Sequence, residues 1–160
     1  MFDSILSQLK TKDQADHLVE ELNNLKFQEF KPDLKSREEQ IKNELGASYA
    51  SELISIVNNQ NISDFAKFID DLISQIKQKK EISLVIAFEP RVKTIDHIYT
   101  WVSQNISKDI LIDIQVDPSI VGGAQITFEG KYGDYSLQNL LSAELNTKGN
   151  EYLKILNKNG

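Results

Sequence analysis

The stretch that decides the fold of the second half is DIQVDPSIVGGAQITFEGKYGDYS, residues 113–136. The whole chain has only seven glycines and three prolines, yet Pro118, Gly122, Gly123, Gly130 and Gly133 all fall within this stretch. Glycines gathered in this way can cradle a phosphate, complete a catalytic site or turn the chain within a small sheet. Which of these uses applies determines much of what can be inferred about function.

The spacing of the glycines argues against a phosphate-binding loop. Six residues separate Gly123 from Gly130, where the P-loop has four, and Tyr132 stands where that loop needs a Ser or Thr to hold magnesium. The intervening sequence AQITFE alternates apolar and polar side chains, which predicts a strand, whereas a phosphate cradle is a loop. The glycines are therefore expected to shape a sheet.

Around this stretch the second half of the chain shows two strand patterns and two helical patterns. EISLVIAFE and ILIDIQVD are rich in β-branched residues or alternate in polarity, as strands do, and residues 95–106 have helical spacing. A closing helix is predicted from the spacing of Leu137, Leu140, Leu141 and Leu145. With AQITFE as a third strand, residues 81–160 predict a small β-α-β-β-α domain.

The first eighty residues have helical periodicity throughout. Thr11, Ser36 and Ser63 are expected N-caps, and SREE resembles a capping box in which Ser36 pairs with Glu39. About four helices fit this length, with a fifth possible at residues 1–9. The sequence therefore predicts an α+β fold, with a helical bundle domain at residues 1–80 and the small α/β domain at residues 81–160.

Composition narrows the function classes. The chain has 160 residues, a net charge of −6, 40% hydrophobic residues and no cysteine. An acidic chain with no face dense in Lys and Arg is a poor nucleic-acid binder, and a chain without cysteine has no disulfide, thiolate nucleophile or cysteine metal site. No stretch approaches the length of a membrane span, and the first residues lack the pattern of a signal peptide.

Few side chains suggest chemistry. His17 has Glu20 and Glu21 on the next helical turn, a spacing that could ligate a metal and that is more often a solvated helix face. His97 has no serine or acidic partner at a spacing typical of a catalytic triad. Trp101 is either an exposed anchor for another protein or a cover for the rim of its own core. No catalytic, cofactor-binding or metal site is predicted.

The residues from VDPSIVGG to GDYS resemble the signature of the delta subunit of the F-type rotary ATP synthase, the family that includes the oligomycin-sensitivity-conferral protein. That pattern is an apolar strand, Asp-Pro, an apolar pair, Gly-Gly, an alternating strand, a glycine turn and Asp-x-Ser before the last helix. The matching residues are Asp117, Pro118, Ile120, Val121, Gly122, Gly123, Ile126, Gly130, Asp134 and Ser136. The resemblance extends over residues 36–145.

Physical chemistry gives the first part of this signature a structural role. Pro118 fixes φ at the end of a strand. Gly122 and Gly123 can take positive φ, or allow close backbone approach where the chain reverses.

The second part of the signature turns the chain into its last helix. Gly130 and Gly133 are expected to turn the chain again, and Asp134 or Ser136 can cap the helix that follows. In this interpretation the glycines shape the fold and do not bind a ligand.

The resemblance implies a non-catalytic stator subunit with a shortened N-terminal domain. Its implied partners are the N-termini of the alpha subunits and the C-terminus of the b subunit. Its implied location is the cytoplasmic face of the cell membrane, or the matrix or stromal face in an organelle, reached only through the complex. The alternative is a free-standing adaptor or regulatory protein built on the same C-terminal domain.

The helical half is also expected to offer a groove for an amphipathic helix, which by resemblance is the N-terminus of an alpha subunit. Two apolar stripes provide more apolar surface than a short bundle easily covers. Their residues are Leu18, Leu22 and Leu25 in one, and Leu53, Ile54 and Val57 in the other.

Overall fold

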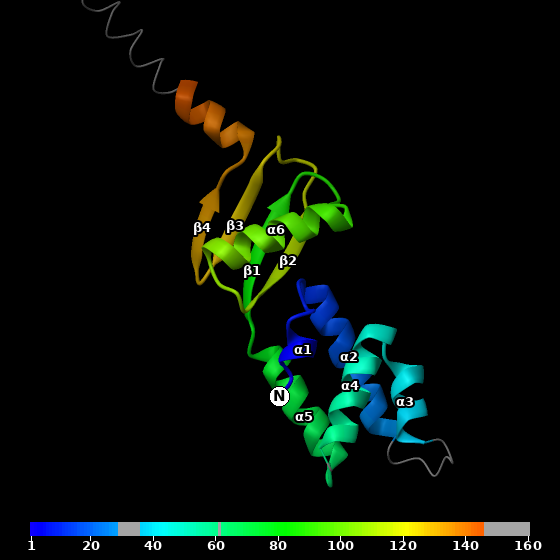
Figure 1. The fold of residues 1–160 in the computed structure, drawn as a ribbon. Coiled ribbons are helices and arrows are strands. Elements are labelled where there is room, and N and C mark those ends of the chain that lie inside the picture. Colours follow the sequence, from blue (N-terminus) through cyan, green and yellow to red (C-terminus); the bar gives the residue numbers. More distant parts are fainter. Residues whose placement is uncertain (29–35, 61, 146–160) are drawn as a thin grey trace, which may run out of the picture. The chain divides into compact units, whose positions relative to one another are not determined.

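The computed structural model describes residues 1–28, 36–60 and 62–145, and it confirms the predicted α+β class (Figure 1). Helices fill the first half, and the strands of one sheet follow. The elements are α1 (Asp3–Leu6), α2 (Lys12–Gln28), α3 (Arg37–Glu44), α4 (Ala47–Asn59), α5 (Phe65–Lys77), β1 (Lys80–Ile86), α6 (Val92–Asn105), β2 (Ile110–Val116), β3 (Ala124–Phe128) and β4 (Lys131–Asp134). Residues 137–145 are also helical.

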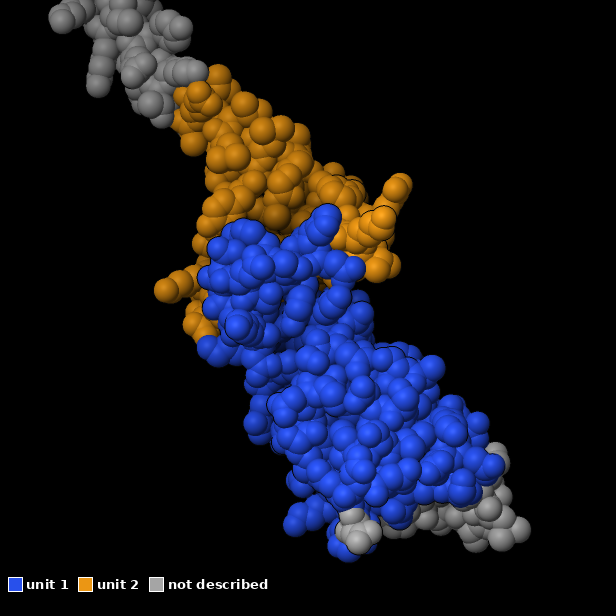
Figure 2. Space-filling view, viewed as in Figure 1, with its two compact units in different colours: residues 1–81, 96–112 blue, residues 82–95, 113–160 orange. Residues whose placement is uncertain are grey.

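The chain forms two compact units, coloured separately in Figure 2. Unit 1 contains residues 1–81 and 96–112, and unit 2 contains residues 82–95 and 113–160. Unit 1 thus combines α1 to α5 with most of α6 and the start of β2. Unit 2 holds the glycine-rich stretch and the helical residues that follow it.

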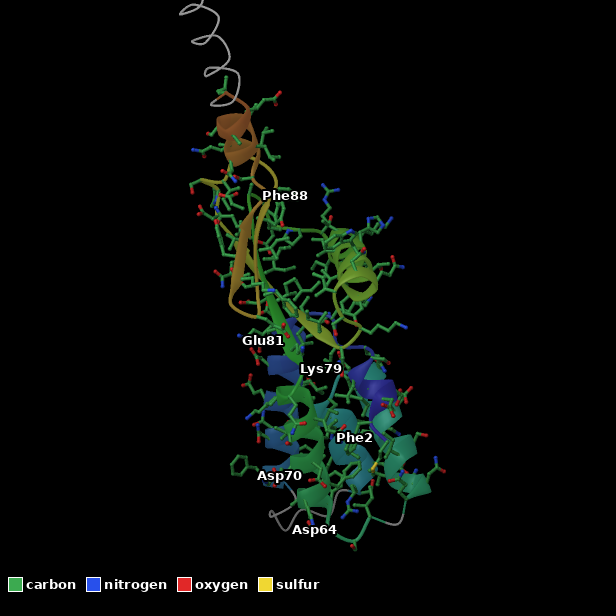
Figure 3. The ribbon with its side chains drawn as sticks, turned by 90° about the vertical axis from the view of Figure 1, so that its left-hand side faces the viewer. Phe2, Asp64, Asp70, Lys79, Glu81 and Phe88 are labelled. Atoms are coloured by element: carbon green, nitrogen blue, oxygen red, sulfur yellow. The ribbon has the colours of Figure 1, made fainter. Side chains whose placement is uncertain are left out.

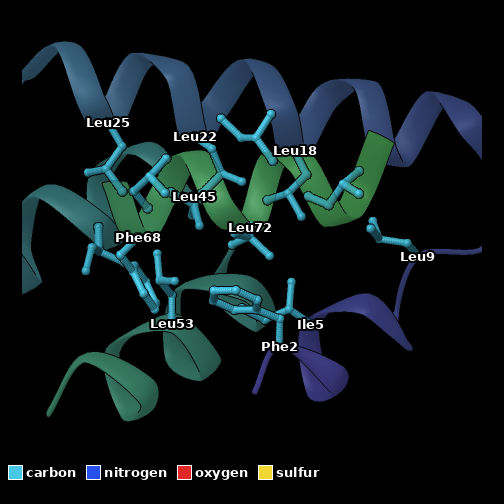
Figure 4. Packing of buried hydrophobic residues seen from close by; sticks show 14 of the residues in the cluster. Phe2, Ile5, Leu9, Leu18, Leu22, Leu25, Leu45, Leu53, Phe68 and Leu72 are labelled. Carbon is cyan, nitrogen blue, oxygen red and sulfur yellow. The ribbon is translucent and has the colours of Figure 1, made fainter. Parts of the chain in front are cut away.

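The core of unit 1 is a cluster of aliphatic and aromatic side chains from α1 to α5 (Figure 4). Leu18, Leu22 and Leu25 from α2 are almost completely buried there, and so is Leu53 from α4. These four leucines were expected to line an exposed groove, and that expectation is wrong. The apolar faces of α2, α4 and α5 close on one another, and Phe2 completes the cluster with its ring centroid 5.1 Å from that of Phe68.

The helix starts follow from local hydrogen bonds. The predicted capping box of α3 is present, because the Glu39 N–H donates to Ser36 Oγ at 3.3 Å and the Ser36 N–H donates to Glu39 Oε2 at 3.3 Å. At α5 the cap is Asp64, whose Oδ1 accepts the Lys67 N–H at 2.9 Å, and the predicted cap Ser63 is wrong by one residue. Phe65, the first residue of α5, is buried directly after this cap.

The sheet has the strand order β2-β1-β3-β4. β1 pairs antiparallel with β3, with Leu84 opposite Ile126, and β3 pairs antiparallel with β4, with Ile126 opposite Gly133. The turn between β3 and β4 contains Glu129 and Gly130, both with positive φ. The sequence did not predict β4, and Gly133 lies within this strand instead of forming a second turn.

Candidate functional site

The first half of the glycine-rich stretch closes the end of β2. The Asp117 N–H donates to the Ile86 carbonyl of β1 at 2.9 Å, and Asp117 Oδ1 accepts the Ser119 N–H at 2.9 Å. Hydrogen bonds from the side chain and the backbone of Ser119 hold the pKa of the Asp117 carboxyl below its ordinary value. The charged carboxylate of Asp117 therefore accepts hydrogen bonds from the turn in which it lies.

Gly122 and Gly123 have the positive φ that the sequence predicted, 65° and 78°. A Cβ on Gly123 would lie 2.2 Å from the carbonyl oxygen of Tyr135, a distance that no real Cβ tolerates. The Leu137 N–H donates to the Gly122 carbonyl at 3.1 Å, and the Tyr135 N–H donates to the Ala124 carbonyl at 2.9 Å. The two glycines therefore let residues 135–137 run directly against the turn.

The helix at residues 137–145 starts from a second turn of the same kind. Asp134 Oδ1 accepts the Ser136 N–H at 2.8 Å, and Ser136 Oγ accepts the Asn139 N–H at 3.3 Å. Of the two predicted candidates, Ser136 is thus the N-cap, while Asp134 holds the backbone of that cap. Hydrogen bonds from Ser136 are the main cause that lowers the pKa of Asp134.

A polar depression of about 340 Å³ lies among these turns. Its lining residues are Asp117, Ser119, Ile120, Gln125, Asp134, Ser136, Gln138, Asn139 and Ser142. Asp134 accepts the backbone N–H of Ser136, and Ser136 Oγ accepts the Asn139 N–H, an arrangement that caps a helix. No described lining residue is a histidine or a cationic side chain that could complete a catalytic pair.

The helix at residues 137–145 has its apolar side uncovered. Leu137, Leu140, Leu141 and Leu145 are 48%, 57%, 50% and 70% exposed. The residues of this helix that line the polar depression are Gln138, Asn139 and Ser142. An ordinary surface helix turns its leucines inward and its polar residues outward. Here the leucines form a solvent-facing surface, which we call the leucine face and define by those four leucines.

The helical unit carries a second concave surface, a depression of about 510 Å³ between α3, α4 and the residues that precede α5. It is lined by Arg37, Glu38, Ile41, Ile54, Val57, Asn58, Ile62 and Ser63. Of the residues predicted to form a groove, only Ile54 and Val57 line it. Asn58 Nδ2 donates to Glu38 Oε1 at 3.0 Å at its rim, so the wall has both apolar and polar parts.

The remaining candidate residues do not form a site. His17 Nε2 lies 3.4 Å from Glu21 Oε1 on an exposed helix face, and no cluster of three potential metal ligands occurs among the described residues. Trp101 is 54% exposed on α6. No helix in residues 1–28, 36–60 and 62–145 has the length and apolar character needed to cross a membrane.

Each unit has an open surface with apolar side chains: a depression with apolar and polar walls in the helical unit, and the leucine face in the other unit. The chain belongs to the ATP synthase delta (OSCP) subunit family, whose model matches residues 8–146. This match begins upstream of residue 36, where the sequence resemblance began, and includes the leucine face. No curated protein matches the chain.

Proposed function

We propose that this chain is a stator subunit of the F-type rotary ATP synthase, that it joins the catalytic head to the peripheral stalk, and that it catalyses nothing itself. The observation that carries the proposal is the leucine face, in a chain that belongs to a family of ATP synthase subunits. A helix of this length is marginal alone in water and gains stability when another chain covers its apolar side. A subunit of a permanent assembly has such a cover.

The leucine face is the proposed contact for the C-terminus of the b subunit. Leucines at positions 137, 140, 141 and 145 offer spaced anchors for an apolar helix, which is how helices commonly pair. The signature residues Asp117, Pro118, Gly122, Gly123, Gly130, Asp134 and Ser136 have a structural role in this proposal. They build the turns that present the leucine face.

The depression between α3, α4 and the residues that precede α5 is the proposed contact for the N-terminus of an alpha subunit. Ile41, Ile54, Val57 and Ile62 supply its apolar part. In this proposal, the domain at residues 1–80 contacts the catalytic head, and the domain at residues 81–160 contacts the peripheral stalk. The subunit is peripheral to the membrane and sits on its cytoplasmic, matrix or stromal face through the complex.

The test is a titration of the full chain with two peptides, the N-terminus of the cognate alpha subunit and the C-terminus of the cognate b subunit, followed by NMR. Leu140→Gln/Leu141→Gln should weaken the b peptide more than tenfold, because each buried anchor is worth about 1 kcal/mol or more. Ala143→Gln lies on the same helix outside the leucine face and serves as the matched control, with at most a twofold change expected.

The alpha peptide should shift resonances around α3 and α4 and should bind equally well to the wild type and to both variants. Equal binding of the b peptide to the wild type and the double variant would remove the leucine face from the stalk contact. Failure of both peptides to bind at millimolar concentration would favour the free-standing adaptor.

A further inference from the structure

Unit 1 includes a segment from the second half of the chain, residues 96–112, that meets residues 9–12. The Ile112 N–H donates to the Lys10 carbonyl at 3.0 Å, and Thr11 forms an isolated parallel bridge with Ile112. Thr11 and Ile112 are both buried, and Leu111 belongs to the hydrophobic cluster of the helices. Residues that are distant in sequence thus form one junction within this unit.

Ion pairs link the three stretches of chain that meet at this junction. Residues 10–12 pair with Asp96 and with Glu81, and residue 79 pairs with Asp109. The described distances are 2.6 Å for Lys10 Nζ to Asp96 Oδ1, 2.9 Å for Lys12 Nζ to Glu81 Oε2, and 2.6 Å for Lys79 Nζ to Asp109 Oδ1. Figure 3 labels Lys79 and Glu81 at the start of β1. The pairs therefore connect residues 10–12 with Glu81 and Asp96, and Lys79 with Asp109.

The three pairs differ in burial. The side chain of Lys79 is only 4% exposed, whereas Asp109 is largely open to solvent. Lys10 and Asp96 are both partly exposed, and the Lys10 ammonium also lies 6.0 Å from the centroid of the Tyr99 ring. A buried ammonium that loses its counter-ion is more costly than a broken surface pair. Removing the counter-ion of Lys79 is thus expected to cost more than breaking either of the other two pairs.

Solvent reaches this junction. A depression of about 310 Å³ is lined by Asp3, Leu6, Ser7, Lys79, Tyr99, Lys108 and Asp109. Dissolved ions can therefore approach the Lys79–Asp109 pair, and screening weakens pairs that are open to solvent. Apolar burial in the helical core responds to salt differently, since it is not weakened by screening. The two kinds of contact can be separated by ionic strength.

We propose that these three ion pairs form a salt-sensitive clasp at the junction. The Lys10–Asp96 and Lys79–Asp109 pairs hold residues 96–112 against the helices of unit 1, and the Lys12–Glu81 pair fixes the start of β1 beside them. Raising the ionic strength loosens the clasp while the core of α2, α4 and α5 stays closed. The clasp is a property of this chain alone and does not depend on the proposed stator function.

The experiment is hydrogen–deuterium exchange of the full chain at low and high sodium chloride, with peptides from residues 96–112 compared with peptides from α2 and α5. Exchange in residues 96–112 should rise about tenfold with salt in the wild type, as expected for the loss of a few weak pairs. Glu81→Gln/Asp96→Asn/Asp109→Asn should show the fast exchange already at low salt, with little further response. Peptides from α2 and α5 should stay protected throughout.

Asp70→Asn is the matched control. It removes the ion pair in which Lys26 Nζ lies 2.6 Å from Asp70 Oδ1, between α2 and α5, at exposures similar to those of the Lys10–Asp96 and Lys12–Glu81 pairs. This variant should leave the exchange of residues 96–112 and its salt dependence as in the wild type. Wild-type exchange in the triple variant, or loss of protection in all peptides at once, would overturn the clasp.

If the triple variant does not fold, exchanging the charges of one ion pair tests the same proposal. Lys10→Glu and Asp96→Lys should each speed exchange in residues 96–112 at low salt, because each breaks a pair that reaches this segment. The double variant Lys10→Glu/Asp96→Lys should restore at least half of the lost protection. No restoration, with both single variants folded, would contradict an ion-pair clasp.

Discussion

The leucines of α2 and those of residues 137–145 recur at similar helical intervals but lie in opposite environments. Leu18, Leu22 and Leu25 are buried in a core that α2 forms with α3 and α5, whereas Leu140 and Leu141 are at least half exposed. Periodicity defines which side chains share a face of a helix, and only the rest of the assembly defines what covers that face. The bundle leucines therefore contribute to folding, and the leucine face is available for binding.

The largest effect predicted from this comparison is a difference in the free energy of unfolding between two single substitutions. Leu22→Ala should lower the free energy of unfolding by about 2–5 kcal/mol, because it leaves a cavity in a closed core. Leu141→Ala should change it by less than about 0.5 kcal/mol, because its side chain already meets solvent. Urea unfolding followed by circular dichroism measures both. A Leu141→Ala variant as unstable as Leu22→Ala would place the leucine face inside the folded chain.

A smaller difference in stability is expected between alanine substitutions at two glycines of the stretch that presents the leucine face. Gly123→Ala combines positive φ with a Cβ placed 2.2 Å from the Tyr135 carbonyl oxygen, so the turn must shift. Gly130→Ala has positive φ alone, since nothing lies within 4 Å of its Cβ. We expect a loss of about 1 kcal/mol at Gly130 and a clearly larger loss at Gly123. Thermal melts of the two variants provide the ranking, and equal melting temperatures would contradict the close approach at Gly123.

The smallest expected effect is a pH dependence of the two turns. The pKa values of Asp117 and Asp134 are both lowered in the folded chain from an ordinary value of 3.8. Their contribution to stability is therefore complete above that value and is lost as the pH falls through the lowered pKa. Resonances of residues 134–139 should shift below pH 3.8 before those of α2 and α5 change. Asp134→Ala should abolish that early shift near Ser136, and persistence of the shift would assign it to another group.

Much of the fold could be predicted because the deciding signals are local. The Ser36–Glu39 capping box, the alternation of AQITFE and the positive φ of Gly122 and Gly123 each depend on a few neighbouring residues. β4 could not be predicted, because KYGD has almost no apolar pattern and is a strand through its pairing with β3. In such a short strand the partner, and not the propensity, decides the structure.

The candidate site was harder to predict, because its surroundings in the folded chain, and not its local sequence, decide which side chains are covered. Helical spacing alone does not distinguish Leu22, which is buried, from Leu141, which is half exposed, and it favoured a groove where the structure has a core. The choice between Asp134 and Ser136 as the cap also required coordinates, because both side chains accept backbone hydrogen bonds two or three residues ahead. The junction of residues 9–12 with residues 96–112 has no local signal at all.

An uncovered leucine face also bears on how long a free copy of the chain persists. Exposed leucines on a short helix favour self-association and local opening, and local opening gives proteases access to the backbone. A copy whose leucine face is covered by a partner loses both routes. If the leucine face binds a partner as proposed, we expect the amount of that partner to limit the amount of this chain that survives.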